Sequence, residues 1–414
     1  MRLNIVYNGE SVGQLLDSTK GIFFEYDEGF IDKEIELSPV KLKLQKRVYG
    51  PWDMNFLRLP GLAYDSLPDR YGMAVLRRRF NELGEANPSP LQMLAFLGTR
   101  TMGALTYEPA NGDPDESRAV DLVHAAQSAR AIIEMDHASE LDPALVASGA
   151  TAGGARPKVL VAMSQSREII VTGSDCIPDG LGAWLLKLET DESHSTAMGR
   201  LEMAYSLMAK AAGITIPETC LVPGPDGLAH FGIRRFDRDI NDPNVRYHTH
   251  TFAGMFQLDF QSPSLDYDGL LRMTRALTRD ATQVAEVFRR MIFNVLGYNH
   301  DDHAKNFSFL MAPDGRWRLS PAYDLLFCEN YHEGNWMMVG GKRNGITYDD
   351  FLRLGEVHSL SRRTVDEMID DVRVALGKWR TFAKKTGVGS GYLETVASCI
   401  KKVDVGPSPS RNVP

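Results

Sequence analysis

The hydrophobic period of this chain changes near residue 250, and that change constrains its fold more than any other feature. Before it, many apolar residues fall in short runs between turn residues, as in strands, with only a few stretches of helical spacing among them. After it they recur at helical spacing over 281–296, at Val284, Val287, Phe288, Met291, Ile292 and Val295. A similar period covers 364–382, where Thr364 and Glu367 have the spacing of a capping box. The sequence therefore predicts an α+β fold with a strand-rich N-terminal module, a mixed α/β segment and a mainly helical C-terminal lobe.

The first 108 residues read as a strand-rich module. Residues 2–15, "RLNIVYNGESVGQL", alternate around Asn8-Gly9, a pair that accepts the positive φ angles of a hairpin turn. More short strands and turns follow, up to "MGALTYEP". We expect one helix in this module, near 67–83.

The middle of the chain predicts a mixed α/β segment. A helix is expected over 119–134, with an apolar stripe made by Leu122, Val123, Ala126, Ala129 and Ile133. The Gly-rich turn "GATAGGARPK" (149–158) leads into the strand-like runs "VLVAM", "EIIVTG" and "AWLLKLE". A helix over about 197–212 is expected to end at Gly213, and Pro225-Asp226-Gly227 separates two further strands.

We therefore predict four parts: the module 1–108, a connector helix and α/β segment 109–245, a helical lobe 246–405 and a flexible tail 406–414. A strand-rich lobe followed by a helical lobe suits a nucleotide bound between them.

Composition narrows the class of protein. The chain has 414 residues, of which 43% are hydrophobic and 24% charged, enough for a large core. A net charge of −8 does not favour direct nucleic-acid binding. Four scattered cysteines, without CxxC spacing, indicate buried thiols in a reducing compartment. With no signal segment or membrane-length apolar run, we expect a soluble cytoplasmic protein.

The most polar stretch, "NHDDHAKNFSFL" (299–310), lies between an apolar helix pattern and an apolar run. Phosphoryl transfer needs a carboxylate for the hydroxyl proton, ligands for Mg²⁺ and a lysine on the phosphates. Asp301 and Asn306 have the D-x-x-x-x-N spacing of a kinase catalytic loop. Asp302 offers a competing four-residue spacing, and a polar loop with capping groups is the alternative interpretation.

A second metal-binding aspartate is expected after a short strand pair. The runs "FSFL" and "WRL", joined by Asp314-Gly315, predict a hairpin that brings Asp324 close to Asp301. Within the loop, we interpret His303 as a hydrogen-bonding scaffold. Lys305 contacts the transferred phosphate or is a solvated charge.

The Gly-rich turn is not a Walker A loop, because Ala155 stands where that motif requires lysine. It is either a tight turn or a phosphate cradle made by the N–H groups of Gly153, Gly154 and Ala155, followed by Lys158. Lys187, within "AWLLKLE", either faces water or binds nucleotide phosphates and pairs with Glu202.

Several motifs in the same order resemble the HipA-like serine/threonine kinases, toxins of bacterial toxin–antitoxin modules. They are "LPDRYG", "LGTRTMGAL", "TAGGARPK", "RRFDR", "GYNHDDHAKNFSFL" and "SPAYDLL". The likeness covers nearly the whole chain. It implies a bilobal protein-kinase-like fold and the use of ATP and Mg²⁺.

The resemblance also implies roles for individual residues. It selects Asp301 as the catalytic base and Asn306 and Asp324 as the metal ligands. The nucleotide-contacting set it implies is Gly153, Gly154, Ala155, Arg156, Pro157, Lys158, Lys187, Arg234, Arg235, Phe236, His303, Lys305 and Tyr323. Arg234 to Phe236 match the hinge that holds adenine in that family.

The family's biology gives further expectations. Its best-known members phosphorylate glutamyl-tRNA synthetase and bind a small helix-turn-helix antitoxin, HipB-like, that carries the DNA affinity. They silence themselves by phosphorylating a serine before the Gly-rich loop, where this chain has Thr151. His300 stands where the family commonly has threonine. We expect DNA contact only through the antitoxin, and no membrane contact.

Three alternatives remain beside a growth-arresting protein kinase. The same phosphate-binding residues would serve a kinase of a small molecule or lipid. A metal-dependent phosphohydrolase is disfavoured, because its G-N-H motif is missing and its D-x-H (Asp301–His303) comes late. A co-repressor scaffold without catalysis is disfavoured by the complete set of Lys187, Asp301, Asn306 and Asp324.

Overall fold

The computed structural model describes residues 1–112, 119–134, 142, 145–146, 156–172, 176–190, 198–224, 227–259, 265–328, 334–403 and 405. These residues form two compact units. Unit 1 contains Met1–Glu192, Val222–Asp259 and Phe309–Arg316, and unit 2 contains Ser193–Leu221, Phe260–Ser308 and Trp317–Pro414. Of the helices within the described ranges, none has the length and apolar character needed to cross a membrane.

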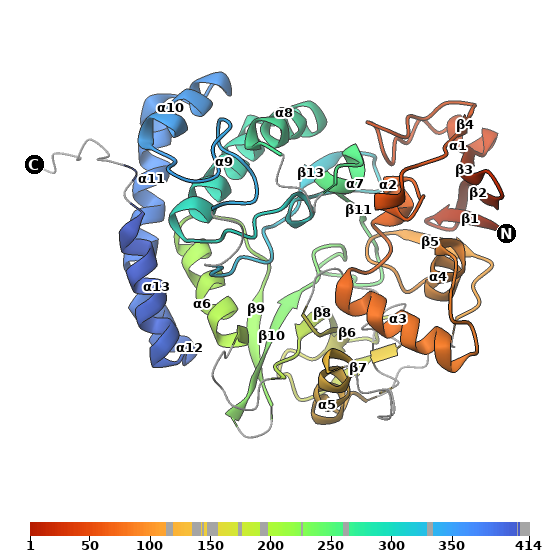
Figure 1. Ribbon diagram of the computed structural model, residues 1–414, viewed down its shortest axis with the longest axis horizontal. Helices are drawn as coiled ribbons and strands as arrows, with labels where there is room; N and C mark the ends of the chain where they lie inside the picture. Colours follow the sequence, from red (N-terminus) through yellow and green to blue (C-terminus); the bar gives the residue numbers. More distant parts are fainter. Residues whose placement is uncertain are drawn as a thin grey trace, which may run out of the picture. The chain divides into compact units, whose positions relative to one another are not determined.

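Unit 1 begins with an antiparallel five-stranded sheet in the order β4-β3-β2-β1-β5 (Figure 1). Its strands are β1 (Arg2–Tyr7), β2 (Glu10–Ser18), β3 (Gly21–Tyr26), β4 (Val48–Tyr49) and β5 (Leu105–Glu108). The predicted hairpin is confirmed: Tyr7 pairs with Glu10, and the turn residues Asn8 and Gly9 have φ angles of 51° and 80°.

The helices of the N-terminal module are more numerous than predicted. They are α1 (Glu28–Ile31), the 3-10 turn η1 (Met54–Phe56), α2 (Gly61–Tyr64), α3 (Arg70–Glu82) and α4 (Pro90–Leu97). The expected helix near 67–83 is α3, but the expectation of a single helix was wrong. Ser89 and Gln92 close a capping box on α4. Its sequence "PLQMLAFL" has little polar character, so no helical period reveals it.

A second five-stranded sheet has the order β7-β6-β8-β10-β9. Its strands are β6 (Lys158–Met163), β7 (Ile170–Thr172), β8 (Gly182–Lys187), β9 (Thr219–Pro223) and β10 (Ala229–Arg234). The three central strands β6, β8 and β10 are antiparallel neighbours, and every residue of β6 is buried. Beyond this sheet, unit 1 also contains β11 (His248–Thr251) and α7 (Phe252–Phe256).

The connector helix α5 (Leu122–Ile133) is present, but the predicted apolar stripe was partly wrong. Val123 and Ile133 are exposed, whereas Ala125, Ala129 and Ile132 are buried. Those three residues are themselves spaced at helical intervals, so the buried face is turned by about one residue from the predicted one.

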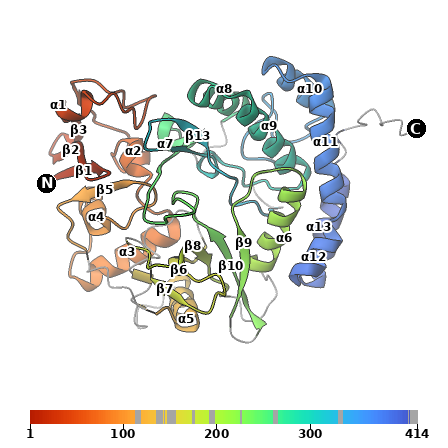
Figure 2. The same ribbon diagram turned by 180° about the vertical axis from the view of Figure 1, so that it is seen from behind.

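Unit 2 is mainly helical. Its helices are α6 (Met198–Ala211), α8 (Tyr267–Thr278), α9 (Ala281–Leu296), α10 (Tyr348–Val357), α11 (Arg362–Gly377), α12 (Trp379–Thr386) and α13 (Ser390–Lys402). Helix α9 contacts α8 and α11, and α6 contacts α11 and α12 (Figures 1 and 2). The predicted bounds of α9 are confirmed, and all six of its predicted apolar positions are buried.

The single helix predicted over 364–382 is two helices in the structure. Ser361, not Thr364, caps α11, because its hydroxyl accepts the Thr364 N–H. Helix α11 ends at Gly377, and glycine has a low propensity to continue a helix. Helix α12 then begins at Trp379, so its apolar residues prolong the same pattern across the break.

Short elements surround the predicted catalytic loop. They are the 3-10 turn η4 (Ala304–Asn306), β12 (Ser308–Met311) and β13 (Trp317–Leu319). The turn at Asp314-Gly315 is present, with the Ala312 N–H donating to the Arg316 carbonyl at 3.1 Å. At the open end of this hairpin the Ser320 N–H donates to the Ser308 carbonyl at 2.9 Å.

Candidate active site

Two buried lysines lie opposite each other in the second sheet of unit 1. The register of β6 and β8 pairs Lys158 directly with Lys187, and these residues are 3% and 6% exposed. Directly opposed residues of antiparallel strands project from the same face. The Lys187 ammonium also lies 6.0 Å from the centre of the Phe231 ring on β10. An anionic group placed on this face would be attracted by both ammonium groups.

The Gly-rich turn leads into this lysine pair. Its residues Thr151, Gly153, Gly154 and Ala155 lie outside the described residues, so their predicted roles stay predictions. Pro157 extends the sheet, since its carbonyl accepts the Leu188 N–H at 2.9 Å. Arg156, one residue earlier, is half-buried.

The predicted adenine hinge lies at the end of β10. The Arg235 N–H donates to the Ala183 carbonyl at 2.9 Å, which prolongs the sheet. The guanidinium of Arg235 is buried and binds both carboxylate oxygens of Asp237, at 2.9 and 2.7 Å. Arg234 donates to the Ile240 carbonyl at 3.0 Å, and Phe236 is half-buried. The Arg235 side chain therefore has a structural partner within the protein.

In unit 2, Asp302 anchors the predicted catalytic loop. Its carboxylate accepts hydrogen bonds from the Tyr267 hydroxyl at 2.6 Å and from Asn335 Nδ2 at 3.1 Å. It also accepts the backbone N–H groups of Trp336, at 2.6 Å, and Met337, at 3.2 Å. Burial raises the pKa of Asp302 to about 6, although these four donors act in the opposite direction. Asp302 is thus a structural residue, a role that spacing alone did not reveal.

The anchor continues into helix α9. Asn294 Nδ2 donates to the Tyr267 hydroxyl at 2.9 Å, and Asn299 Nδ2 donates to Asn294 Oδ1 at 3.0 Å. The first residue of the polar loop is therefore tied to the helix that precedes it.

Asp301 has the opposite environment to its neighbour. Its side chain is 41% exposed, whereas Asp302 is 1% exposed. The nearest ring nitrogen of His303 lies 3.9 Å from its carboxylate, and the His303 ring meets Trp336 edge to face. Anchoring one aspartate inside leaves the other at the surface of unit 2, where a substrate hydroxyl could reach it.

The orientation of Asn306 suits a metal ligand. Its Nδ2 donates to the Asp301 carbonyl at 2.8 Å, which fixes which end of the amide carries the oxygen. That oxygen accepts no hydrogen bond from the residues that the structure describes. Lys305, next to it, is buried.

The segment that carries Asp324 is bonded along the same loop. The Tyr323 hydroxyl bonds the Lys305 carbonyl at 2.7 Å and Ser308 Oγ at 2.5 Å. Farther along, the Cys328 N–H donates to the Tyr298 carbonyl at 2.9 Å. Asp324 therefore lies in a segment held to the loop on both sides. Its φ of 57° is unusual for a residue other than glycine, and such strain concentrates at functional sites.

These residues fit a magnesium–nucleotide ligand. Mg²⁺ prefers oxygen ligands and is commonly held by one or two carboxylates together with substrate phosphates. The Asp324 carboxylate and the amide oxygen of Asn306 are ligands of this kind. Across the described ranges no three His, Cys, Asp or Glu side chains form a cluster that could hold a metal ion.

Glu202 and His300 are two further residues that the sequence analysis singled out. Glu202 is buried on α6, but it belongs to unit 2 and Lys187 to unit 1, so their ion pair stays a prediction. The His300 ring lies 4.5 Å from the Tyr298 ring, and its carbonyl accepts the Trp336 N–H at 3.0 Å.

Comparison with known proteins identifies the family. Residues 150–379 match the HipA-like C-terminal domain, and residues 3–108 match the HipA N-terminal domain. The chain therefore belongs to the HipA-like family, as the motifs predicted.

Two relatives come from Sinorhizobium fredii, and both carry names that describe candidate kinases. Y4dM is 28% identical over 91% of this chain and 90% of its own length. Y4mE is 27% identical over 94% and 86%. A chain in the solved complex of the Shewanella oneidensis MR-1 toxin–antitoxin proteins HipA and HipB with operator DNA has the same fold. Its TM-score is 0.68 at 16% identity, over 96% of this chain and 95% of that one.

Proposed function

We propose that this protein is a serine/threonine protein kinase that transfers the γ-phosphate of ATP to a protein hydroxyl. The proposal rests mainly on the different surroundings of two adjacent aspartates in the loop. Asp302 is buried and anchors the loop, whereas Asp301 is half-exposed and precedes Asn306 by five residues. The names of the relatives support a kinase, and the lysine pair of the second sheet supports an anionic ligand.

The residues have distinct roles in this proposal. The oxygen of the substrate hydroxyl bonds to the γ-phosphorus while the bond between that phosphorus and ADP breaks. Asp301 accepts the proton that the hydroxyl loses. Lys158 and Lys187 bind the phosphates, and Arg234 to Phe236 hold the adenine. Asn306 and Asp324 hold Mg²⁺, which when bound neutralises charge on the phosphates. The hydrogen bonds among Asp302, Tyr267 and Asn294 hold the loop in position.

The test is incubation of the purified protein with γ-labelled ATP and a bacterial cell extract, followed by identification of the labelled product. We expect label on serine or threonine of a protein, with an aminoacyl-tRNA synthetase as the first candidate. Label only in a small molecule or lipid would support the alternative kinase class. The absence of any Asp301-dependent label would overturn the proposal and favour a scaffold without catalysis.

The cellular role that we propose is growth arrest, reversed by a small helix-turn-helix antitoxin. Support comes from the shared fold with a chain of the HipA, HipB and operator DNA complex. The net charge of −8 suits a protein that contacts DNA only through such a partner. Induced expression should stop growth of a bacterial host, and Asp301→Asn should remove the arrest.

Thr151 is a proposed site of autophosphorylation. A phosphate there would add about −1.5 to −2 charges at pH 7 and compete with ATP for the donors of the Gly-rich turn. Threonine keeps the hydroxyl of the family's serine, but its branched side chain is stiffer. Peptide mass spectrometry should find phosphate on Thr151 in wild type and none in Asp301→Asn. An unmodified Thr151 in a preparation that phosphorylates other proteins would refute this role.

A further inference from the structure

A small hairpin follows the candidate hinge in unit 1. The Tyr247 N–H donates to the Asp237 carbonyl at 2.9 Å, and Arg238 forms an antiparallel bridge with Arg246. Asp237 and Arg246 therefore lie near each other at the open end of this hairpin, directly after Arg234–Phe236.

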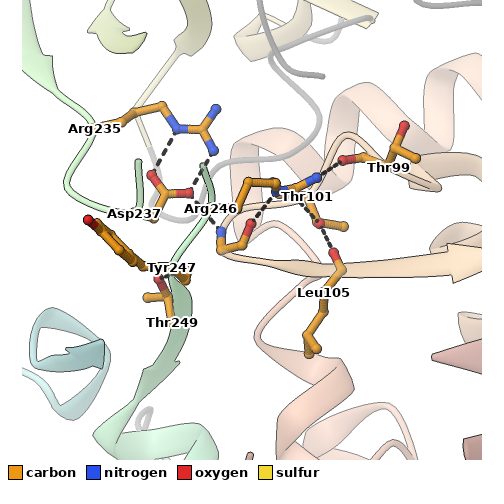
Figure 3. A network of polar contacts seen from close by, with 9 residues as sticks. Thr99, Thr101, Leu105, Arg235, Asp237, Arg246, Tyr247 and Thr249 are labelled. Atoms are coloured by element: carbon orange, nitrogen blue, oxygen red, sulfur yellow. Dashed lines mark hydrogen bonds and ion pairs between the residues drawn. The ribbon is translucent and has the colours of Figure 1, made fainter. Parts of the chain in front are cut away.

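Arg246 binds a loop of the N-terminal module (Figure 3). This loop, residues 99–103, belongs to the motif "LGTRTMGAL". The Arg246 guanidinium donates to the carbonyls of Thr99 at 2.8 Å, Thr101 at 2.9 Å and Gly103 at 2.7 Å. One planar cation thus satisfies three backbone carbonyls, a geometry that lysine does not reproduce.

Asp237 joins the same loop to the hinge (Figure 3). The Gly103 N–H donates to Asp237 Oδ2 at 2.7 Å, and the same carboxylate holds the Arg235 guanidinium. Burial by itself would raise the pKa of Asp237, but Arg235 and Arg238 outweigh it and hold the pKa well below its usual range. Gly103 has a φ of 76°, and an added Cβ would lie 3.1 Å from the Thr249 nitrogen. Any larger residue at this contact is therefore strained.

We infer that Asp237 is a positioning residue for the nucleotide hinge, and that the 99–103 loop of the N-terminal module supports it. The inference rests on the proposed ATP-binding function. The N-terminal module then affects ATP affinity through the hydrogen bonds that link Gly103, Asp237 and Arg235. The phosphoryl transfer step depends instead on the catalytic loop 299–310.

A second polar connection of the module supplies a matched control. Asp65 accepts His250 Nδ1 at 2.6 Å and the Thr251 N–H at 2.7 Å, and His250 Nε2 lies 3.0 Å from Ser38 Oγ. The arrangement has the order of a hydrolase triad, but Ser38 is 2% and His250 0% exposed, so no substrate reaches it. This connection ties the module to β11 without bonding Arg235.

The test compares Asp237→Asn with Asp65→Asn. Each change removes one buried carboxylate charge that holds the N-terminal module, but only the first faces the hinge. The measurements are the Kd for Mg-ATP by calorimetry, kcat and KM, the melting temperature, and hydrogen exchange of residues 229–238 without ligand. Arg246→Lys serves as a second hinge-side variant if Asp237→Asn does not fold.

We expect Asp237→Asn to weaken ATP binding and raise KM by about tenfold, the size of one lost charge-assisted hydrogen bond, with kcat nearly unchanged. Exchange at 229–238 should accelerate in that variant alone. Asp65→Asn should lower the melting temperature and leave the Kd unchanged.

Equal shifts of Kd in both variants would overturn the inference, since loss of the module would then be the cause. Unchanged exchange at 229–238 in Asp237→Asn would overturn it too. Failure of the wild type to bind Mg-ATP would instead count against the proposed function, and the exchange measurement would still decide the positioning role.

Discussion

At the scale of single residues, two adjacent aspartates have opposite surroundings. Asp302 is enclosed by the Tyr267 hydroxyl, Asn335 and two backbone N–H groups, and Asp301 is half-exposed. A buried carboxylate that is ionised at neutral pH costs stability, even with four donors around it. The loop therefore accepts a cost at one residue in order to hold the next in place.

This cost predicts a pH dependence. The pKa of Asp302 is about 6 in the folded protein against 3.8 for an ordinary aspartate. The folded state therefore binds more protons between about pH 4 and pH 6, and stability falls as pH rises through that window, by up to about 3 kcal/mol. Asp302→Asn cannot titrate, so the stability difference between wild type and variant should change in this window and be constant above it. Denaturant midpoints of both proteins from pH 4 to pH 8 measure it. A difference that moves in the wild type's favour as pH rises would contradict the assignment.

At the scale of elements, the pairing of β6 with β8 determines where Lys158 and Lys187 lie relative to each other. The alternation of β8 alone leaves open whether Lys187 faces water or a ligand, and only the register shows that Lys158 and Lys187 share one buried face. Strand patterns fix which residues alternate, but not which residue of another strand lies opposite. The same limit explains α5, where the sequence predicted a helix but misplaced its buried face by one residue.

The lysine pair predicts a ligand-dependent stability. A ligand that binds only the folded state raises stability by RT ln(1 + [L]/Kd). Lys158→Gln and Lys187→Gln should each reduce the rise in melting temperature that Mg-ATP produces, and Lys187→Gln should abolish phosphoryl transfer. The exposed Lys20→Gln in the same unit is the control and should keep the full rise. Thermal denaturation with and without Mg-ATP measures the effect, and equal rises in all four proteins would refute a phosphate-binding role.

At the scale of the whole molecule, the sequence predicts local elements more reliably than contacts between distant residues. Asn8-Gly9, the bounds of α9 and the loop 299–310 carry local patterns, and the structure contains the elements that they predicted. The bond from Gly103 to Asp237 joins residues 134 positions apart. No local pattern encodes such a contact, so the bond between the N-terminal module and the segment after β10 was not predictable.

In the candidate site, too, local patterns are predictable from the sequence and long-range contacts are not. Spacing identified Asp301, Asn306 and Asp324 as candidates, and the structure adds the hydrogen bonds of Tyr323 and Asn306 that order their segments. The anchoring role of Asp302 depends on Tyr267 and Trp336, which lie more than thirty residues away on either side. Sequence spacing could only offer Asp302 as a rival base.

The most direct measurement is the rate of phosphoryl transfer from γ-labelled ATP by purified wild type, Asp301→Asn and Asp302→Asn, with a melting temperature for each. Positioned general bases contribute about 10²–10⁴-fold. We predict that Asp301→Asn loses a factor of this size at an unchanged melting temperature. Asp302→Asn should melt earlier, because one amide oxygen cannot accept the four hydrogen bonds that the carboxylate accepts, and it should keep more activity per folded molecule. Full activity in Asp301→Asn, or loss of transfer in a stably folded Asp302→Asn alone, would contradict the assignment of Asp301 as the base.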